Sequence, residues 1–262
     1  MRKYWELMKS QIKLDSAYSI WYWSGIVATM LRVFVIYSFW NAVYDHRVEV
    51  SNMPLNMMLT YVILAAMLSN YSAGVGYELA NQVRDGNVAI ELMRPYDLMH
   101  KLVALDLGMK ITNSIRNTLP ILILAFLFLG ISLPHTWLMG LLSILSAIIG
   151  IFLGAQLDMI IGILAFWVFY IWGLRVLRNA VFLFFSGALL PISMFPEWLQ
   201  TVSEFLPFQS IVYVPVAIYT GQIIGNDVYT SILLQLAWLV VVYTIIRLLW
   251  SFALRKVTIF GG

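Results

Sequence analysis

The sequence predicts an all-α integral membrane protein, and both its composition and the spacing of its apolar blocks support this fold class. Hydrophobic residues fill 61% of the 262 positions and charged residues only 11%, whereas charged residues make up about 25% of soluble domains. The apolar residues come in blocks of about twenty, which is the length that a helix needs to cross the hydrocarbon core. Such a chain cannot cover itself with polar surface, so we expect a bilayer around it.

Six apolar blocks predict six transmembrane helices in a single transmembrane domain, residues 1–262. The first block follows a charged segment and lacks a small-residue cleavage site, so we expect it to remain in the membrane. Polar residues, prolines and glycines separate the blocks. In chain order the blocks are approximately Ile20–Ala42, Leu55–Gly76, a third that includes Leu119–Leu133, Trp137–Phe166, a fifth that follows Asn179 and reaches Met194, and Tyr229–Trp250.

The N-terminal segment, residues 1–19, predicts an amphipathic helix at the membrane interface. Trp5, Met8 and Ile12 recur at helical spacing, whereas Lys9 and Lys13 fall elsewhere around the helix. We expect this helix to lie on the cytoplasmic surface rather than to cross the bilayer.

The positions of lysine and arginine predict that both termini are cytoplasmic, because positively charged loops stay on that side. With the N-terminus inside, the outside loops hold only Arg47, and residues 195–228 hold acidic residues but neither Lys nor Arg. The remaining clusters fall inside: Arg2, Lys3, Lys9 and Lys13; Arg84, Arg94 and Lys101; Arg175 and Arg178; Arg255 and Lys256.

Arg32 is the ionisable residue placed deepest in an apolar block, and it is a candidate for the transport pathway. A charge in hydrocarbon costs at least about 2.5 to 3.5 kcal/mol on insertion scales. Arg32 therefore either contacts a lipid-like or anionic substrate, or forms a buried ion pair, or extends its side chain to the interface.

A polar stripe precedes the third apolar run. Asp106, Lys110, Asn113, Asn117 and Pro120 recur at intervals of three or four residues, and the first two are spaced to pair on a helix. Asn113 and Asn117 are candidate pathway residues if the stripe faces a cavity. In the alternative, the helix begins in the cytoplasm and enters the bilayer only near its apolar run.

No catalytic or metal-binding pattern is present. The sequence has no G-x-x-x-x-G-K-[ST] phosphate loop, no cysteine, and only three histidines, which fall in separate loops. The net charge of +3 is accounted for by topology, so we expect no nucleic-acid partner. We expect no enzymatic activity, no catalytic residue, no metal and no cofactor in this chain itself.

Two stretches resemble the ABC-2 type transporter permeases, particularly a bacterial branch of about this length. Residues 85–95, DGNVAIELMRP, resemble that family's "G, then L-x-R-P" stretch. Residues 186–199, SGALLPISMFPEWL, followed by Leu206-Pro207-Phe208, resemble the G-x-x-x-P-x-x-x-F-P-x-W-L and L-P-F signatures. Together with the six-span layout, the resemblance covers essentially the whole chain.

The resemblance implies a permease subunit in the bacterial cytoplasmic membrane that acts as a dimer, either with a second copy or with a sister permease. Two cytoplasmic ABC ATPase subunits would bind ATP and Mg, and residues 78–101 would contain the helix that couples to them. Gly86 suits a turn, Pro95 ends a helix, and Glu91 and Arg94 offer charges to a soluble partner. The alternative for these four residues is an ordinary solvated loop.

The resemblance also implies that residues 195–228 fold back into the outer leaflet as short helices. This segment is too apolar for a free loop, and its prolines break it into pieces too short to span. Irregular backbone at membrane depth must be buried in protein or line a wet cavity. The predicted cap of the pathway exit comprises Phe195, Pro196, Trp198, Pro207 and Phe208.

These observations predict the membrane-spanning subunit of an ATP-driven exporter for a lipid-like, amphipathic or peptide-type substrate, in contact with membrane lipids. The alternative is an ion-coupled secondary transporter of a hydrophobic small molecule, which needs acidic residues within the membrane and usually an internal repeat. Only Asp158 approaches that requirement, and the two halves share no visible pattern. A membrane-embedded enzyme or scaffold is a third class.

Overall fold

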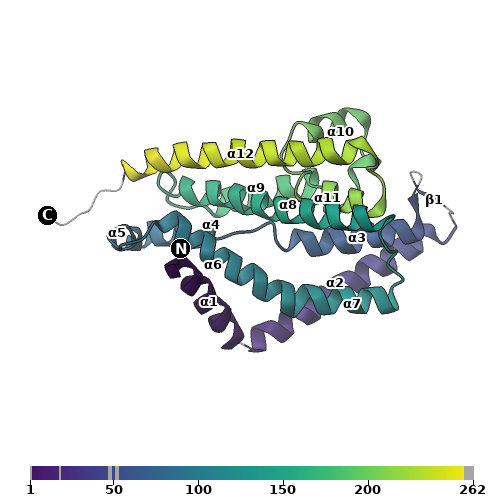
Figure 1. The fold of residues 1–262 in the computed structure, drawn as a ribbon, viewed down its shortest axis with the longest axis horizontal. Helices are drawn as coiled ribbons and strands as arrows, with labels where there is room; N and C mark the ends of the chain where they lie inside the picture. Colours follow the sequence, from purple (N-terminus) through teal and green to yellow (C-terminus); the bar gives the residue numbers. More distant parts are fainter. Residues whose placement is uncertain (1, 18, 47–48, 51–52, 257–262) are drawn as a thin grey trace.

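The computed structural model describes residues 2–17, 19–46, 49–50 and 53–256, which form an elongated bundle of helices (Figure 1). The helices are α1 Arg2–Ala17, α2 Ser19–Tyr44, α3 Leu55–Ser69, α4 Gly76–Arg84, α5 Asn87–Leu92, α6 Leu98–Asn113, α7 Leu119–Phe128, α8 Trp137–Leu164, α9 Trp172–Phe185, α10 Glu197–Glu204, α11 Tyr213–Thr220 and α12 Asn226–Leu254. A π-helical turn at Ser114–Thr118, a 3₁₀ turn at Ile192–Met194 and the two-residue strands β1 Glu49–Val50 and β2 Met53–Pro54 complete the described elements. The predicted all-α class is confirmed.

Four helices of the described residues are long and apolar enough to cross a membrane, whereas the sequence predicted six. They are Ser24–Tyr44, Leu98–Phe128, Trp137–Leu164 and Asn226–Leu254. The other two predicted blocks form α3, with 15 residues, and α9, with 14 residues. Both are shorter than the roughly twenty residues that a spanning helix needs, so six spans remain a prediction.

Backbone breaks shorten these two helices. α3 ends at Ser69, and the chain turns before α4 begins at Gly76. α9 ends at Phe185, two residues before Gly187, whose φ of +78° is a left-handed conformation that favours glycine. α9 also begins at Trp172, so the prediction that its helix follows Asn179 was wrong by about two turns.

The third span differs from its prediction at both ends. Its helix begins at Leu98, where the Asp97 carboxylate caps it by accepting a hydrogen bond from the backbone N–H of His100 at 2.9 Å. A π-helical turn lies just before Pro120, where the proline removes one backbone donor. The helix ends at Phe128, and Gly130 has a φ of +64°, so the end of the Leu119–Leu133 run is not helical.

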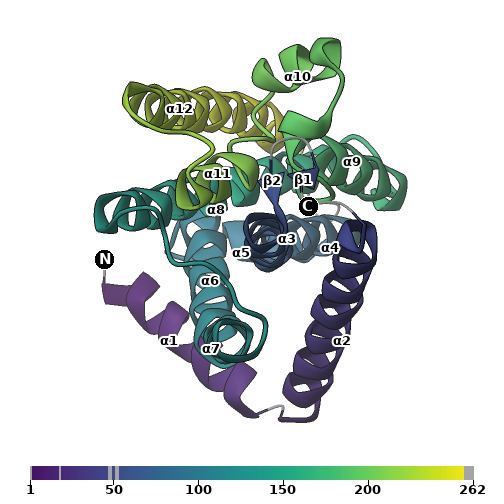
Figure 2. The same cartoon turned by 90° about the vertical axis from the view of Figure 1, so that its right-hand side faces the viewer.

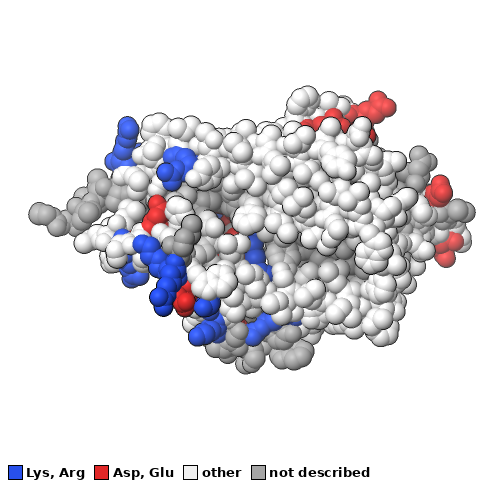
Figure 3. All heavy atoms as spheres, in the orientation of Figure 1, with Lys and Arg blue, Asp and Glu red and all other residues white. Residues whose placement is uncertain are grey.

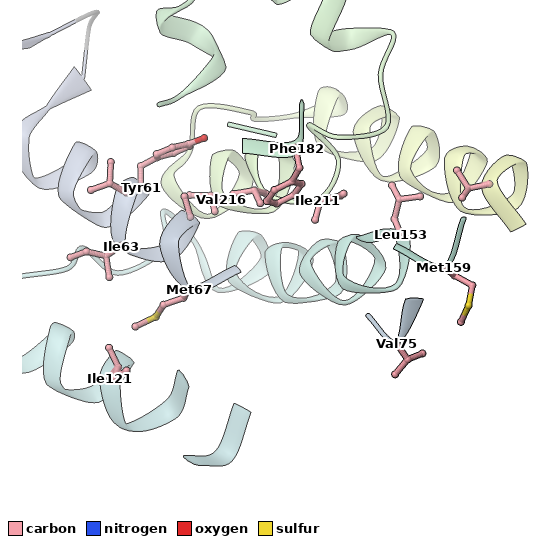
Figure 4. Packing of buried hydrophobic residues seen from close by; sticks show 14 of the residues in the cluster. Tyr61, Ile63, Met67, Val75, Ile121, Leu153, Met159, Phe182, Ile211 and Val216 are labelled. Carbon is pink, nitrogen blue, oxygen red and sulfur yellow. The ribbon is translucent and has the colours of Figure 1, made fainter. Parts of the chain in front are cut away.

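α3 is the centre of the hydrophobic core. Figure 4 shows Met67 of this helix pointing toward Ile121 of α7, and Tyr61 lying beside Val216 of α11. The Tyr61 hydroxyl donates to the Gly187 carbonyl at 2.8 Å, which satisfies a polar group that is fully buried. α3 is therefore largely enclosed by protein, and few of its side chains reach the outside.

α8 lies between α12 and α6 in both views of the ribbon (Figures 1 and 2). Gly150 and Gly154 of this helix form a G-x-x-x-G pattern, which allows close packing. A Cβ on Gly150 would lie 2.8 Å from the Ile211 carbonyl, and one on Gly154 would lie 3.1 Å from Ser72 Cα. Gly150 and Gly154 thus pack against irregular backbone and not against a neighbouring helix.

The proline-rich segment forms short helices, as predicted from its prolines. α11 is almost wholly buried against α8 and α3, whereas α10 lies at the surface. A fully buried glutamine, Gln235 of α12, fixes this region: its amide nitrogen donates to Ser210 O at 2.7 Å, and its oxygen accepts from the Ser146 hydroxyl at 2.9 Å.

The two ends of the bundle carry different charges. Figure 3 shows Lys and Arg gathered at the end that carries α5, whereas the opposite end of this face, near β1 and α10, shows only Asp and Glu. We call these the basic end and the acidic end. The end of α12 and the start of α1 both lie toward the basic end (Figure 1). Arg47, the one basic residue expected outside, is not among the described residues.

Candidate functional site

The segment predicted to couple to an ATPase, residues 78–101, lies at the basic end and folds as most of α4, all of α5 and the start of α6. Gly86 forms the turn between α4 and α5 with a φ of +75°, and nothing lies within 4 Å of where its Cβ would be. The glycine is therefore needed for its backbone conformation and not for space. Pro95 follows α5 in the exposed link to α6.

Glu91 is the centre of this segment's polar contacts. Its carboxylate pairs with Lys101 at 2.6 Å and Arg94 at 3.2 Å, and it accepts a hydrogen bond from the Tyr96 hydroxyl at 3.0 Å. Burial raises the pKa of Glu91, but the hydrogen bonds from Lys101 and Tyr96 and the charges of Lys101 and Arg94 outweigh it, so the pKa lies below its usual value. Glu91 thus holds α5 against α6.

The two charges expected to face a soluble partner are placed differently. Glu91 is buried, whereas the Arg94 side chain is half exposed, and its guanidinium also donates to the Tyr96 hydroxyl at 2.9 Å. Of these two charged residues, only Arg94 is accessible to a partner protein. Beside it lie two apolar side chains that the sequence analysis did not single out: Ile90 is 57% exposed and Met93 80% exposed. Ile90 and Met93 are three residues apart, which places their side chains on one face of a helix, and this spacing could have identified them from the sequence.

The N-terminal helix α1 packs along α6 and touches the same segment. The Lys3 ammonium donates to the Pro95 carbonyl at 2.6 Å, and the backbone N–H of Asp97 donates to the Tyr4 hydroxyl at 3.0 Å. Farther along, a Cβ on Gly108 would lie 2.8 Å from the Met8 carbonyl. The predicted helix is confirmed, and α6 covers its Met8 face.

The predicted apolar stripe of α1 is only partly packed. Met8 is buried, but Trp5 is 56% exposed, and the Lys9 ammonium lies 5.5 Å from the centroid of its ring. An exposed tryptophan beside a lysine suits a membrane interface.

A buried carboxylate joins α4 to α8. Asp158 Oδ2 accepts hydrogen bonds from the backbone N–H groups of Gly74 and Gly76, both at 3.0 Å. The backbones are also in close contact, because a Cβ on Gly162 would lie 2.4 Å from the Gly76 carbonyl. Residues 78–101 are therefore fixed to α8 at their start through Asp158.

Arg178 lies beside this junction and corrects the sequence prediction. The sequence placed Arg178 in a cytoplasmic loop, but it lies within α9, only 8% exposed, and its guanidinium donates to the carbonyls of Ser72 and Gly154. The break between α3 and α4 leaves carbonyl groups without helical partners, and Arg178 supplies a donor there. Its charge also acts on Asp158.

The predicted pathway residues Arg32, Asn113 and Asn117 fall in two separate places. Arg32 is exposed on α2 and has no ion-pair partner among the described residues. Asn117 donates to Asn113 at 2.5 Å within their own helix, and the expected pair of Asp106 and Lys110 forms at 2.5 Å. No single site gathers Arg32, Asn113 and Asn117.

The predicted cap residues lie toward the acidic end with different exposures. Phe195 stacks on Phe184 with ring centroids 5.3 Å apart, Pro207 is buried and Phe208 packs against the core. Pro196 and Trp198 are exposed on the side that carries α10.

The family model for the ABC-2 family transporter protein matches residues 27–261. The chain belongs to this family. Comparison with curated proteins finds no match. The sequence resemblance to ABC-2 permeases is thus confirmed over nearly the whole chain.

Membership in the ABC-2 family makes this protein the multi-pass membrane component of an ABC transport system, which is not itself catalytic and which associates with ABC ATPase components. Among the described residues, no three His, Asp or Glu side chains gather where they could hold a metal ion.

Two cavities of the ABC-2 protein lie beside α8, and both are lined mostly by apolar side chains. One, of about 500 Å³, lies among α3, α7, α8 and α11, and Tyr71, Thr118 and Tyr219 are among its few polar residues. Tyr71 also bonds Thr118 at 2.5 Å. The other, of about 300 Å³, lies among α6, α8 and α12.

Proposed function

We propose that this ABC-2 protein forms half of an ATP-driven export pathway in the bacterial cytoplasmic membrane. It would act as a dimer, with a second copy or a sister permease, on two cytoplasmic ATPase subunits that bind ATP and Mg. The segregation of charge supports placing the basic end in the cytoplasm, because basic residues are retained on that side. Both termini and residues 78–101 would then face the ATPase.

The observation that carries this proposal is the construction of residues 78–101. The segment presents Ile90, Met93 and Arg94 outward, while Glu91 and Pro95 bind it to α6 and α1. Apolar anchors beside an arginine are typical of the centre of a protein interface. The contacts behind them would keep that surface in place when a partner docks.

The same contacts suggest how movement would pass into the membrane. ATPase closure would push on α5, and the Asp158 bonds and the Gly76–Gly162 contact would make α4 carry α8 with it. α8 packs along α12 and α11, so tilting it would change the cavities on its flanks. Alternating access requires two such arrangements of the same packed elements.

The cavities favour a lipid-like, amphipathic or peptide-type substrate. Both are lined mostly by apolar side chains, with a few polar groups, as sites for amphipathic ligands are. Family membership speaks against the ion-coupled alternative, because it associates the protein with ATPase components. Asp158, the acidic residue on which that alternative depended, is bonded to backbone N–H groups.

We further propose that α3 and α9 complete six spans together with the segments that follow them. Fifteen residues of α3 rise about 22 Å, and the buried, hydrogen-bonded chain after each helix would complete the crossing inside protein, where irregular backbone is tolerated. α10 and α11 would lie in the outer leaflet and, with Phe195, Trp198 and Phe208, close the pathway exit.

Affinity purification of the tagged chain from its native membrane, with mass spectrometry and an ATPase assay, tests the coupling surface. Replacing Ile90 and Met93 by aspartate should abolish recovery of the ABC ATPase. The matched control replaces Trp198 and Phe205, exposed aromatics toward the acidic end, and should leave recovery unchanged. Full recovery with the first variant, or loss with the control, would overturn the proposed surface.

A further inference from the structure

The cavity of about 300 Å³ among α6, α8 and α12 has an apolar wall and a polar rim. Its apolar lining includes Val75, Val103, Phe152, Met159 and Ile246, contributed by all three helices and by the turn before α4. α12 and α6 lie on opposite sides of α8 (Figure 2). The lining residues run from Met99 to Asp106 on α6 and from Phe152 to Met159 on α8, so the cavity extends about two turns along these helices, as an acyl chain would.

Two polar side chains of this cavity have no partner in the part of the chain that the structure describes. The amide oxygen of Gln156 is buried and accepts no hydrogen bond. Arg247 is exposed and forms no ion pair with any described carboxylate. A buried amide without a partner calls for an explanation, and a bound ligand supplies one.

The charges around the cavity favour an anionic ligand. Asp106 also lines it, but the Lys110 ammonium neutralises this carboxylate at 2.5 Å. His100 is held by Asp97 at 2.8 Å. The unpaired charge that remains at the cavity is the guanidinium of Arg247, a group suited to binding a phosphate by two parallel hydrogen bonds.

The depth of Arg247 matches a lipid headgroup. It lies about two turns, or about 10 Å, before the end of α12 at Leu254. A long side chain at this depth reaches the membrane surface while its stem stays among apolar groups. A ligand phosphate at Arg247 would thus lie at the surface of the leaflet next to the basic end, with an acyl chain reaching into the cavity.

We infer that this cavity binds an anionic glycerophospholipid such as phosphatidylglycerol. Arg247 binds the phosphate, Gln156 accepts a hydrogen bond from a hydroxyl of the headgroup or glycerol region, and Val103 and Phe152 contact one acyl chain. This inference concerns a lipid site of the permease and holds whichever substrate is transported and in whichever direction.

Native mass spectrometry of the purified full-length chain, titrated with phosphatidylglycerol and with phosphatidylcholine of the same acyl chains, tests the site. The wild type should bind phosphatidylglycerol more tightly, and Arg247→Gln should weaken that binding about tenfold or more while leaving phosphatidylcholine unchanged. Arg255→Gln removes an equal charge from an exposed position just after α12 and should change neither.

Two further variants separate a binding role from a structural one. Val103→Trp, at a half-exposed position of α6, fills the cavity and should exclude both lipids without lowering helicity. Gln156→Leu removes a buried amide that has no partner, so it should raise the melting temperature without lipid and yet weaken phosphatidylglycerol binding.

Three results would overturn the inference. Equal binding of the two lipids by the wild type would leave only an unspecific apolar groove. Equal losses in Arg247→Gln and Arg255→Gln would indicate attraction to the surface as a whole. Competition by inorganic phosphate alone, with no effect of Val103→Trp, would indicate a phosphate site in place of a lipid site.

Discussion

Two junctions on α8 hold the bundle together, and they are built from different chemistry. Toward the basic end, Asp158 accepts from Gly74 and Gly76, and Arg178 fills the break between α3 and α4. Toward the acidic end, Gln235 joins α12 to Ser146 and to the carbonyl of Ser210 with neutral hydrogen bonds alone. Both bring irregular backbone against α8.

This difference in chemistry predicts that the two junctions differ in strength. A buried charge that loses its partner costs far more than a buried amide that loses one, so we expect the basic junction to stay closed as a unit in the proposed coupling movement. The neutral junction fixes α11 and α12 to α8 with weaker bonds. We expect mutations at the first to cost more than mutations at the second.

The largest expected effect follows from steric contact at the basic junction. Gly162→Val should lower the free energy of unfolding by about 3 kcal/mol, because its side chain would overlap the Gly76 carbonyl. Gly173→Ala, where nothing lies within 4 Å of the added Cβ, should change stability by less than about 1 kcal/mol. Denaturant unfolding in mild detergent measures both, and equal stability of the two variants would contradict the close packing described here.

Asp158→Asn should cost about 2 kcal/mol, since it removes a charge-assisted acceptor and leaves Arg178 without its nearby negative charge. Asp227→Asn, at an exposed position in the first turn of α12, is the matched control and should be close to neutral. Thermal melting in detergent gives the comparison. A wild-type melting temperature for Asp158→Asn would show that the charge of Asp158 does not contribute.

A smaller effect is expected at the neutral junction. Gln235→Leu should cost about 1 to 2 kcal/mol, because it leaves the Ser146 hydroxyl and the Ser210 carbonyl without this partner. Ser146→Ala should cost about 1 kcal/mol. The double variant should cost less than the sum of the two, as residues of one network do; strict additivity in unfolding experiments would speak against a shared network.

The smallest effect concerns pH at Glu91. Its pKa is lowered in the folded chain, so its contribution to stability is fully present above the unfolded-state pKa and is lost as pH falls through the folded-state pKa. The stability difference between wild type and Glu91→Gln, about 1 kcal/mol or less at pH 7, should therefore persist down to about pH 5 and shrink as the pH falls below 4.5. Melting temperatures of the two proteins over this pH range measure it. A difference independent of pH would contradict the ion pairs with Arg94 and Lys101.

The sequence predicted the features that depend on local pattern. Long apolar runs gave the four long helices, prolines predicted the short helices after Met194, and the spacing of Asp106 and Lys110 predicted their pair. These properties follow from residues within a few turns of one another.

The remaining features depend on contacts between distant segments. Hydropathy averaged along the chain could not show that α9 ends early, because Ala188, Leu189 and Leu190 continue the apolar run past its end. The sequence places Arg178 in a loop, because only the structure shows that its guanidinium donates to the carbonyls of Ser72 and Gly154. The sequence predicts Glu91 to be a surface charge, because its ion pair with Lys101 depends on the packing of α6 against α5.

Site-specific photocrosslinking in the native membrane tests most directly that the basic end is the ATPase-binding end. A photoreactive amino acid at Met93 should form a cross-link to the ABC ATPase that depends on Ile90, whereas the same probe at Trp198 or Phe205 should form none. Cross-links from Trp198 or Phe205, with none from Met93, would contradict both the coupling surface and the proposed orientation.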